Sequence, residues 1–217
     1  MANRTPLSRG RILEAAVRVA DRGGLAAVSM RSVAREAGVE AMSLYHHVAN
    51  KQAVLDALAG WAFEQIPLPE GGGDWRAEMG ARARASREVL GAHPWALGLL
   101  ESRSNPARAV LAHHDATIGA LRAGGFSLWL AAHAYSLLDA YVFGFVLTEQ
   151  NLPFEEGQDA EDFVVGLEMP ADEFPHLAAF MGELIVGGSY DFADEFEVGL
   201  EMILDQLATR LRLENRA

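Results

Sequence analysis

The chain has 217 residues and half of them are apolar, so it can bury a sizeable core as one large helical domain or as a small head and a larger body. Cysteine is absent, which excludes disulfides and thiolate metal sites and fits a reducing cytosol. The net charge of −12 argues at first sight against nucleic acid as a partner.

The N-terminal part of the sequence predicts one helix followed by a helix-turn-helix. The first helix is expected over residues 8–22, where apolar residues share one face and a glycine pair follows. Residues 29–51 then predict two short helices and the start of another. Ser29 is the expected N-cap, because its hydroxyl can accept a backbone N–H. Gly38 is expected to end that helix in the left-handed conformation, and residues 41–48 form the next one.

The helix over residues 41–48 has the properties of a DNA recognition helix. With Leu44 and Val48 facing inward, its outer surface is short, exposed and uncharged, and it follows a glycine turn. The residues on or near that surface are Ala41, Met42, Ser43, Tyr45, His46 and His47. An ordinary helical hairpin would give the same pattern, because this geometry also occurs away from DNA.

The rest of the chain also predicts helices. A fourth helix is expected over residues 51–66, and a cluster of helix breakers at residues 67–74 follows it. We place a domain boundary there, between a head at residues 1–66 and a body at residues 67–217. Further helices are expected over residues 75–90, 94–101, 106–123, 128–150, 160–168, 177–186 and 191–213. No period-2 pattern predicts a strand, so the expected fold is all-α, with a three-helix helix-turn-helix head and a helical-bundle body.

Charge is distributed unevenly along the chain. The first 60 residues carry eight basic and five acidic side chains, a net charge of +3, and the remainder has a net charge of −15. This asymmetry is expected if only the head meets phosphate, since the body is then repelled from DNA. The alternative is that the acidic residues only keep the body soluble.

Two body helices are too apolar for the surface of a monomer. Residues 127–150 are apolar nearly all round, and residues 191–213 carry a full-length apolar stripe. A four-helix bundle built from two such helices of each subunit predicts a homodimer. The alternative is that both helices lie at the centre of one subunit. Because three polar residues interrupt the first of them, we favour a buried helix over a membrane span and expect a cytoplasmic protein without a signal segment.

The order of short motifs in the head resembles the tetracycline-repressor (TetR) family of transcription regulators. Residues 29–58 contain Val-Ala, Ala-Gly-Val, Leu-Tyr-x-His-Val, Asn-Lys and Leu-Asp-Ala-Leu in that order. The body is more weakly similar to the tetracycline-repressor-like C-terminal domain, through Gly-Phe-Ser-Leu, Phe-Gly-Phe-Val-Leu and Phe-Glu-Val-Gly-Leu-Glu. The resemblance implies an all-helical homodimer whose heads bind a palindromic double-stranded DNA operator and whose bodies hold a small-molecule effector.

The resemblance also implies DNA contacts at matching positions. Ser29 would touch phosphate, and Arg31 would read a base, because a forked guanidinium suits guanine O6 and N7. The positions implied to contact the DNA backbone are Tyr45, His47 and Lys51. Ala41 and Met42 replace larger or polar base-reading residues, so the operator sequence is expected to differ. The alternatives are a solvated surface charge for Arg31 and packing between helices for Tyr45.

The implied effector pocket has candidates on three helices of the body. They are His93, Val110, His113, Thr117, Tyr135, Leu138 and Asp139. A pocket with aromatic walls and a few polar groups suits a planar or amphipathic organic ligand. Each of these residues has an alternative role in the core or in a dimer contact. Asp139 lies in an apolar helix and would be costly without a partner, so we expect it to pair with a cationic ligand, His133 or His113.

The expected mechanism is repression relieved by the effector, and a ligand-responsive activator and a helical adaptor without DNA binding are the alternatives. Glu101 and Ala81-Arg82 stand where the family has a magnesium-binding histidine and a drug-anchoring asparagine, so no recognition of tetracycline–magnesium is expected. No residue is assigned to a metal or a cofactor, and whether a metal accompanies the effector stays open. An enzyme is not expected, because adjacent histidine pairs do not chelate one ion easily and no catalytic motif is present.

Overall fold

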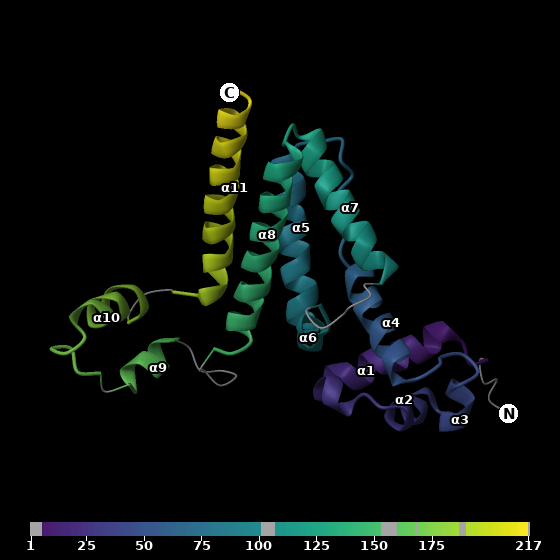
Figure 1. The fold of residues 1–217 in the computed structure, drawn as a ribbon. Helices are drawn as coiled ribbons and strands as arrows, with labels where there is room; N and C mark the ends of the chain where they lie inside the picture. Colours follow the sequence, from purple (N-terminus) through teal and green to yellow (C-terminus); the bar gives the residue numbers. More distant parts are fainter. Residues whose placement is uncertain (1–5, 101–106, 153–159, 168, 187–189, 217) are drawn as a thin grey trace.

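The computed structural model describes residues 6–100, 107–152, 160–167, 169–186 and 190–216, and every regular element among them is helical (Figure 1). The predicted all-α fold is therefore confirmed over this part of the chain. The N-terminal elements are α1 (Arg9–Ala27), α2 (Met30–Ala37), α3 (Ala41–Leu44) and α4 (Lys51–Glu64). They share one core, in which α2 packs on α1 and α3 packs on α2.

The predicted caps in this part of the chain are confirmed, but the first helix is longer than expected. The Ser29 hydroxyl accepts from the Ser32 backbone N–H at 3.1 Å, and Gly38 ends α2 with φ = 69°. In α1 the glycine pair does not end the helix. It produces a kink, with Gly24 at φ = 64°, and one more turn follows as far as Ala27. The kink is possible because glycine adopts positive φ without a Cβ clash.

The recognition helix is shorter than predicted, since α3 ends at Leu44 and not at Val48. The chain then turns through three residues, with the His47 N–H donating to the Leu44 carbonyl at 2.8 Å. The tighter turn brings the chain to Asn50, whose side chain caps α4 by accepting from the Ala53 N–H at 2.9 Å. An N-cap needs extended backbone, so a helix that continued to residue 48 would leave little room for the reversal.

The body contains the remaining elements. They are α5 (Trp75–Ala92), η1 (Pro94–Ala96), α6 (Leu97–Leu100), α7 (Arg108–Ala123), α8 (Leu128–Glu149), α9 (Ala160–Val165), α10 (Pro175–Phe180), η2 (Met181–Ile185), η3 (Phe192–Asp194) and α11 (Glu195–Glu214). Figure 1 shows α5, α8 and α11 side by side, with α7 inclined from their upper end down to α4. The α9 and α10 helices lie to one side, beyond the lower ends of α8 and α11.

Several predicted bounds of the body helices are corrected. The helix expected from Pro106 begins at Arg108 after an Ala107 cap, while Pro106 itself lies outside the described residues. The last helix begins at Glu195 after a 3-10 turn, because the Asp191 side chain caps that turn through the Ala193 N–H. The helix expected over residues 177–186 begins at Pro175 and changes to a π-turn at Met181. The helix expected over residues 160–168 ends at Val165.

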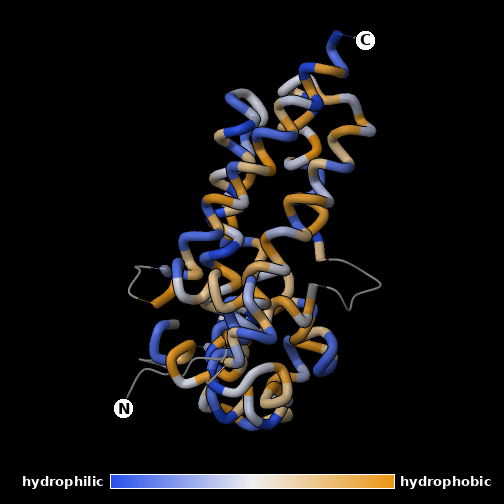
Figure 2. Tube along the Cα trace, turned by 90° about the vertical axis from the view of Figure 1, so that its left-hand side faces the viewer, coloured by the Kyte–Doolittle hydropathy of each residue, from blue (hydrophilic) through white to orange (hydrophobic). Residues whose placement is uncertain are grey.

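Apolar residues form the core and also remain on the outside of the body. Figure 2 shows them along the full length of the body helices. The large apolar side chains exposed on α8 and α11 are Leu128, Trp129, Leu137, Leu147, Val198, Met202 and Leu213. By length and composition alone, Leu128–Glu149 is the one described helix that could cross a membrane, a property that core helices of soluble proteins share.

Candidate DNA-binding surface and effector site

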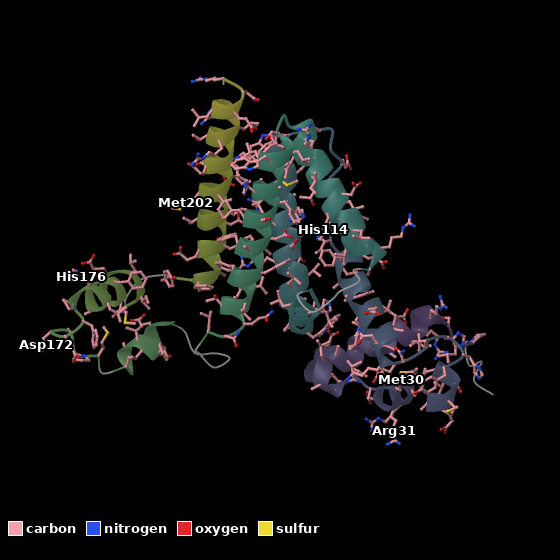
Figure 3. All side chains as sticks on the ribbon, viewed as in Figure 1. Met30, Arg31, His114, Asp172, His176 and Met202 are labelled. Atoms are coloured by element: carbon pink, nitrogen blue, oxygen red, sulfur yellow. The ribbon has the colours of Figure 1, made fainter. Side chains whose placement is uncertain are left out.

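The candidate DNA-binding surface is formed by the start of α2, by α3 with its following turn, and by the start of α4. Arg31 is the second residue of α2 and is exposed, and Figure 3 shows it pointing away from the body. Met42 is 74% exposed and Tyr45 48% exposed, so the Tyr45 ring is not buried between helices. Lys51 is exposed at the first position of α4. Three elements therefore present side chains on one outer surface.

The predicted DNA-contacting residues differ in how far they are exposed on this surface. Exposed residues are Ser29, Arg31, Met42, Tyr45, His46 and Lys51, and half-buried ones are Ala41, Ser43 and His47. Among the described residues Arg31 has no ion-pair partner. A guanidinium that is exposed and unpaired remains available to a nucleic acid, whereas Ser29 already uses its hydroxyl to cap α2.

Four arginines of α1 bond to α2 and to the turn that follows α3. The sequence alone gave these arginines no role. The Arg9 side chain donates to the His47 carbonyl at 3.0 Å, and Arg11 donates to the Ala37 carbonyl at 3.2 Å. Arg18 and Arg22 both pair with Glu36 of α2, Arg18 at 2.7 Å. Hydrogen bonds from these two arginines lower the pKa of the Glu36 carboxyl. Arg18 and Arg22 are four residues apart and therefore lie on the same face of α1, and this spacing could have indicated that they share one acidic partner.

The body contains a buried polar cluster between α5, α7 and α8. Arg82 of α5 pairs with Asp139 of α8 at 2.7 Å, with their side chains only 4% and 14% exposed. The Tyr135 ring lies 5.9 Å from the Arg82 guanidinium carbon. Burial and the Asp139 carboxylate raise the pKa of Tyr135, so its hydroxyl stays protonated at neutral pH.

Two neighbouring histidines of α7 border this cluster. His113 is buried, and its Nε2 donates to the Ile66 carbonyl at 2.8 Å, just beyond the end of α4. The His114 ring lies 5.0 Å from the Tyr135 ring, in the space that Figure 3 shows between α7 and the α5–α8 pair. Burial lowers the pKa of both histidines, so both are neutral at pH 7.

The two histidine partners predicted for Asp139 were wrong, because the structure pairs it with Arg82. His133 is exposed, with its ring 4.1 Å from that of Trp129, and His113 bonds to Ile66. Arg82 and Asp139 come from different helices, so spacing along the chain gave no sign of the pair. The only available signal was that a cation in the middle of an apolar helix face also needs a partner.

The other predicted effector residues are dispersed. Thr117 is fully buried and its hydroxyl donates to the His113 carbonyl of its own helix at 2.7 Å. Leu138 is a core residue and Val110 is half-buried. His93 lies away from the cluster, where its Nδ1 is 2.8 Å from the Asp21 carboxylate of α1. The structure thus brings Tyr135 and Asp139 together and leaves the pocket assignment of the others as a prediction.

Two cavities flank the end of α4. An open cleft of about 360 Å³ is lined by Phe63, Glu64, Ile66, Leu68, Arg108, Ala109, Ala112 and His113. A nearly closed cavity of about 10 Å³ is lined by Ala62, Phe63, Ile66, Arg82, Ser86, Leu90 and Phe143. They share Phe63 and Ile66 as a common wall, so a ligand in either cavity contacts α4 and the residues that follow it. Within the described part of the chain, no group of three or more histidines and carboxylates is arranged to hold a metal ion.

Two family models match the chain, and together they cover both of its parts. The model for bacterial regulatory proteins of the tetR family matches residues 12–58, which include the helix-turn-helix. The model for the tetracyclin repressor-like C-terminal domain matches residues 66–211. The chain belongs to the TetR family. It is therefore a helix-turn-helix transcriptional regulator with a ligand-binding C-terminal domain.

Relatives of known name agree with the TetR assignment. An HTH-type transcriptional regulator of Saccharopolyspora erythraea is 36% identical, over 96% of this chain and 87% of the relative. The HTH-type transcriptional repressor DrrR1 of Streptomyces coeruleorubidus is 31% identical, over 93% of this chain and 77% of the relative. The structure of the TetR-family protein ActR of Streptomyces coelicolor, in complex with actinorhodin, superposes with a TM-score of 0.75 at 30% identity and covers 96% of this chain and 97% of ActR.

Proposed function

We propose that this TetR-family regulator is a cytoplasmic homodimeric repressor that leaves a palindromic operator when a small organic effector binds in its body. Residues 1–66 are the DNA-binding domain, and residues 67–217 bind the effector and form the dimer. The protein acts by binding and has no enzyme activity. The repressor name of DrrR1 and the ActR complex with actinorhodin support this mode of action.

The observation that carries the proposal is the position of α4. Its first residue, Lys51, lies on the candidate DNA-binding surface, and Phe63 near its other end lines both cavities beside the buried polar cluster. A ligand that moves the end of α4 therefore changes the orientation of the head. Two heads on a palindrome must lie about 34–36 Å apart, so a small change in α4 disturbs the fit. Coupling of this kind is typically about 1–3 kcal/mol.

The proposed DNA contacts are divided between base reading and phosphate binding. Arg31 reads a base, and the phosphate contacts come from Ser29, Tyr45, His47 and Lys51, with Ala41, Met42, Ser43 and His46 facing the groove. The exposure of Arg31 and its lack of an ion pair with any described residue support the first assignment. The proposed effector contacts are Tyr135, Asp139 and His113, with His93, Val110, Thr117 and Leu138 around them.

Replacement of Arg31 tests the proposal. Fluorescence anisotropy on the intergenic DNA beside the protein's own gene should show salt-sensitive binding by the parent. Arg31→Ala should weaken that binding by about 1–3 kcal/mol and relax specificity at one base position. Arg216→Ala is the matched control, an exposed arginine near the end of the chain that should leave binding unchanged. Equal affinities of the parent and Arg31→Ala would refute the base-reading role.

A further inference from the structure

Two buried polar atoms have no hydrogen-bond partner in the described part of the chain, and each belongs to a residue that lines a cavity at the end of α4. They are Arg82 Nε and His113 Nδ1. Arg82 is 5% exposed and His113 2% exposed. A buried donor or acceptor without a hydrogen bond is costly. A ligand group that forms a hydrogen bond with such an atom removes this cost and therefore gains binding free energy.

Arg82 offers a donor with its charge already balanced. Its Nη2 pairs with Asp139 at 2.7 Å, whereas its Nε–H has no partner among the described residues. Arg82 and Ser86 both line the nearly closed cavity. An N–H of a guanidinium is a strong donor to a carboxylate or carbonyl oxygen. A cationic ligand group, by contrast, would have to displace Arg82 from Asp139 to gain a counter-charge.

His113 offers an acceptor. Its Nε2 lies 2.8 Å from the Ile66 carbonyl, which can only accept, so the ring proton is on Nε2 and a lone pair remains on Nδ1. Burial lowers the pKa of His113, which keeps this neutral tautomer at pH 7. A neutral imidazole nitrogen of this kind accepts from a hydroxyl. His114 and Tyr135 beside it are also neutral, so they add no charge to the site.

The walls around these two atoms are mainly apolar and aromatic. Phe63 and Ile66 separate the two cavities, and the Phe63 ring lies 5.4 Å from the His113 ring. Phe143 and Leu90 close the inner cavity, whose volume of about 10 Å³ holds no more than about one water molecule. The outer cleft of about 360 Å³ is large enough for a small ring system. A ligand that reaches Arg82 from the cleft therefore displaces the Phe63 side chain.

We propose that the site takes an aromatic hydroxy acid or hydroxy ketone, whose acid or carbonyl oxygen accepts from Arg82 Nε and whose hydroxyl donates to His113 Nδ1. This rests on the proposed function, in which the body binds an effector. It adds the chemical class of that effector and assigns Arg82, absent from the sequence-based candidates, as the specificity-determining residue. Binding in this position displaces Phe63 of α4, which links ligand chemistry to the orientation of the head.

The first test uses naphthalene probes on the unmodified protein, measured by isothermal titration calorimetry. The probes are 6-hydroxy-2-naphthoic acid, 2-naphthoic acid without the hydroxyl, 2-naphthol without the carboxylate, and 2-naphthylmethylamine as the cation. The hydroxy acid should bind about tenfold more tightly than either singly substituted probe, and the amine most weakly. An amine that binds as tightly as the hydroxy acid, or no measurable binding of either acid, overturns the proposal.

The second test assigns each preference to one residue. Arg82→Met/Asp139→Leu removes both charges together, so no unpaired charge is left in the core. It should abolish the gain from the carboxylate, measured as the hydroxy acid against 2-naphthol, while keeping the gain from the hydroxyl, measured as the hydroxy acid against 2-naphthoic acid. His113→Phe should do the reverse, because it keeps an aromatic ring beside Phe63 and loses the acceptor. Preferences that match those of the parent in both folded variants overturn the assignment, and if a variant does not fold, the probe series on the parent decides.

The experiments distinguish an error in the proposed ligand class from an error in the proposed regulator function. Operator binding by the parent is measured first, without any probe. If the protein binds DNA and the probes show no acid or hydroxyl preference, the ligand class is wrong and the regulator function stands. If the preferences appear and the hydroxy acid does not weaken DNA binding, the site is correct and effector-driven release from DNA is wrong.

Discussion

At the scale of single residues, the Arg82–Asp139 ion pair is the most consequential contact in the body. Burying two charges has a large desolvation cost, and their mutual attraction offsets it only while both are present. The side chains are 4% and 14% exposed, so solvent screens the pair only weakly. The pair therefore makes the body sensitive to the loss of either partner and much less sensitive to the loss of both.

Loss of one partner should destabilise the protein more than loss of both. Asp139→Ala leaves the Arg82 guanidinium uncompensated, and the free energy of unfolding should fall by about 3–5 kcal/mol. Arg82→Met/Asp139→Leu should recover most of that loss, because two apolar side chains of similar volume fill the same space. Urea unfolding at one fixed protein concentration measures both. A double variant that is no more stable than Asp139→Ala would show that the cost is not electrostatic.

The buried His113 and the half-buried His114 predict how stability depends on pH. Burial is the main cause that lowers the pKa of His113 and of His114 below the ordinary 6.5, so below that pH the unfolded chain takes up protons that the folded chain does not. Their contribution to stability is complete above pH 6.5 and is lost as the pH falls below it. Urea unfolding at about pH 7.5 and about pH 5.5 should show the loss. His113→Phe should reduce it, and an unchanged pH dependence in that variant would contradict the assignment.

The sequence predicted that the Asp139 carboxylate needs a partner, but it did not predict that the partner is Arg82. The requirement is local, since a carboxylate among apolar residues on one helix is costly wherever it is buried. The identity of the partner is not local, because Arg82 comes from another helix and the pairing depends on how α5 packs against α8. The exposed residues on the candidate DNA-binding surface were easier to predict, since exposure follows from the apolar spacing of a single helix.

At the scale of elements, local signals predicted the helix starts that have a side-chain cap. Ser29, Asn50 and Ser127 each cap a helix through their own side chain, which is a property of a few adjacent residues. The end of α3 depends instead on where α4 must begin. The contact of η1 with both α1 and α4 was also missed, because it joins segments far apart in the chain.

Asp21 is the residue through which η1 holds α1. One oxygen of its carboxylate accepts from His93 Nδ1 at 2.8 Å and from Trp95 Nε1 at 2.6 Å, and the Trp95 ring stacks 6.1 Å from Trp61 of α4. Asp21→Ala should lower the free energy of unfolding by about 1 kcal/mol, since the carboxylate is partly exposed. It should also accelerate amide hydrogen exchange in η1 and in the second half of α1.

The control for the Asp21 prediction is another exposed acid of the same helix. Glu14 has no hydrogen-bond or ion-pair partner among the described residues, so Glu14→Ala should leave both readouts unchanged. Asp21→Asn keeps the accepting oxygen and should retain most of the stability. If Asp21→Ala and Glu14→Ala exchange at the same rate in η1, the contact does not hold the two parts together.

At the scale of the whole molecule, charge and apolar surface lie in different places. The head has a net positive charge and the body a strongly negative one, so a duplex is attracted at one end and repelled along the rest. Apolar side chains remain exposed on α8 and α11. An apolar surface of this extent indicates a partner, and a symmetric partner would place a second head for the other half of a palindromic site. Sequence periodicity predicted this surface, whereas the contacts that cover it depend on a second chain.

Substitution on α11 tests whether that surface joins two subunits. Met202 is 67% exposed, so Met202→Glu is tolerated in a lone subunit but would bury a carboxylate in an apolar interface of a dimer. Analytical ultracentrifugation should show the parent at twice the 23.5 kDa of one chain and Met202→Glu shifted toward a single chain. Leu111→Glu, at a leucine 53% exposed on α7, is the matched control and should remain a dimer.

Because a lone subunit supplies one head, Met202→Glu should also lose most of its affinity for a full palindrome while keeping weak binding to a half-site. Identical sedimentation of all three proteins would place the interface elsewhere.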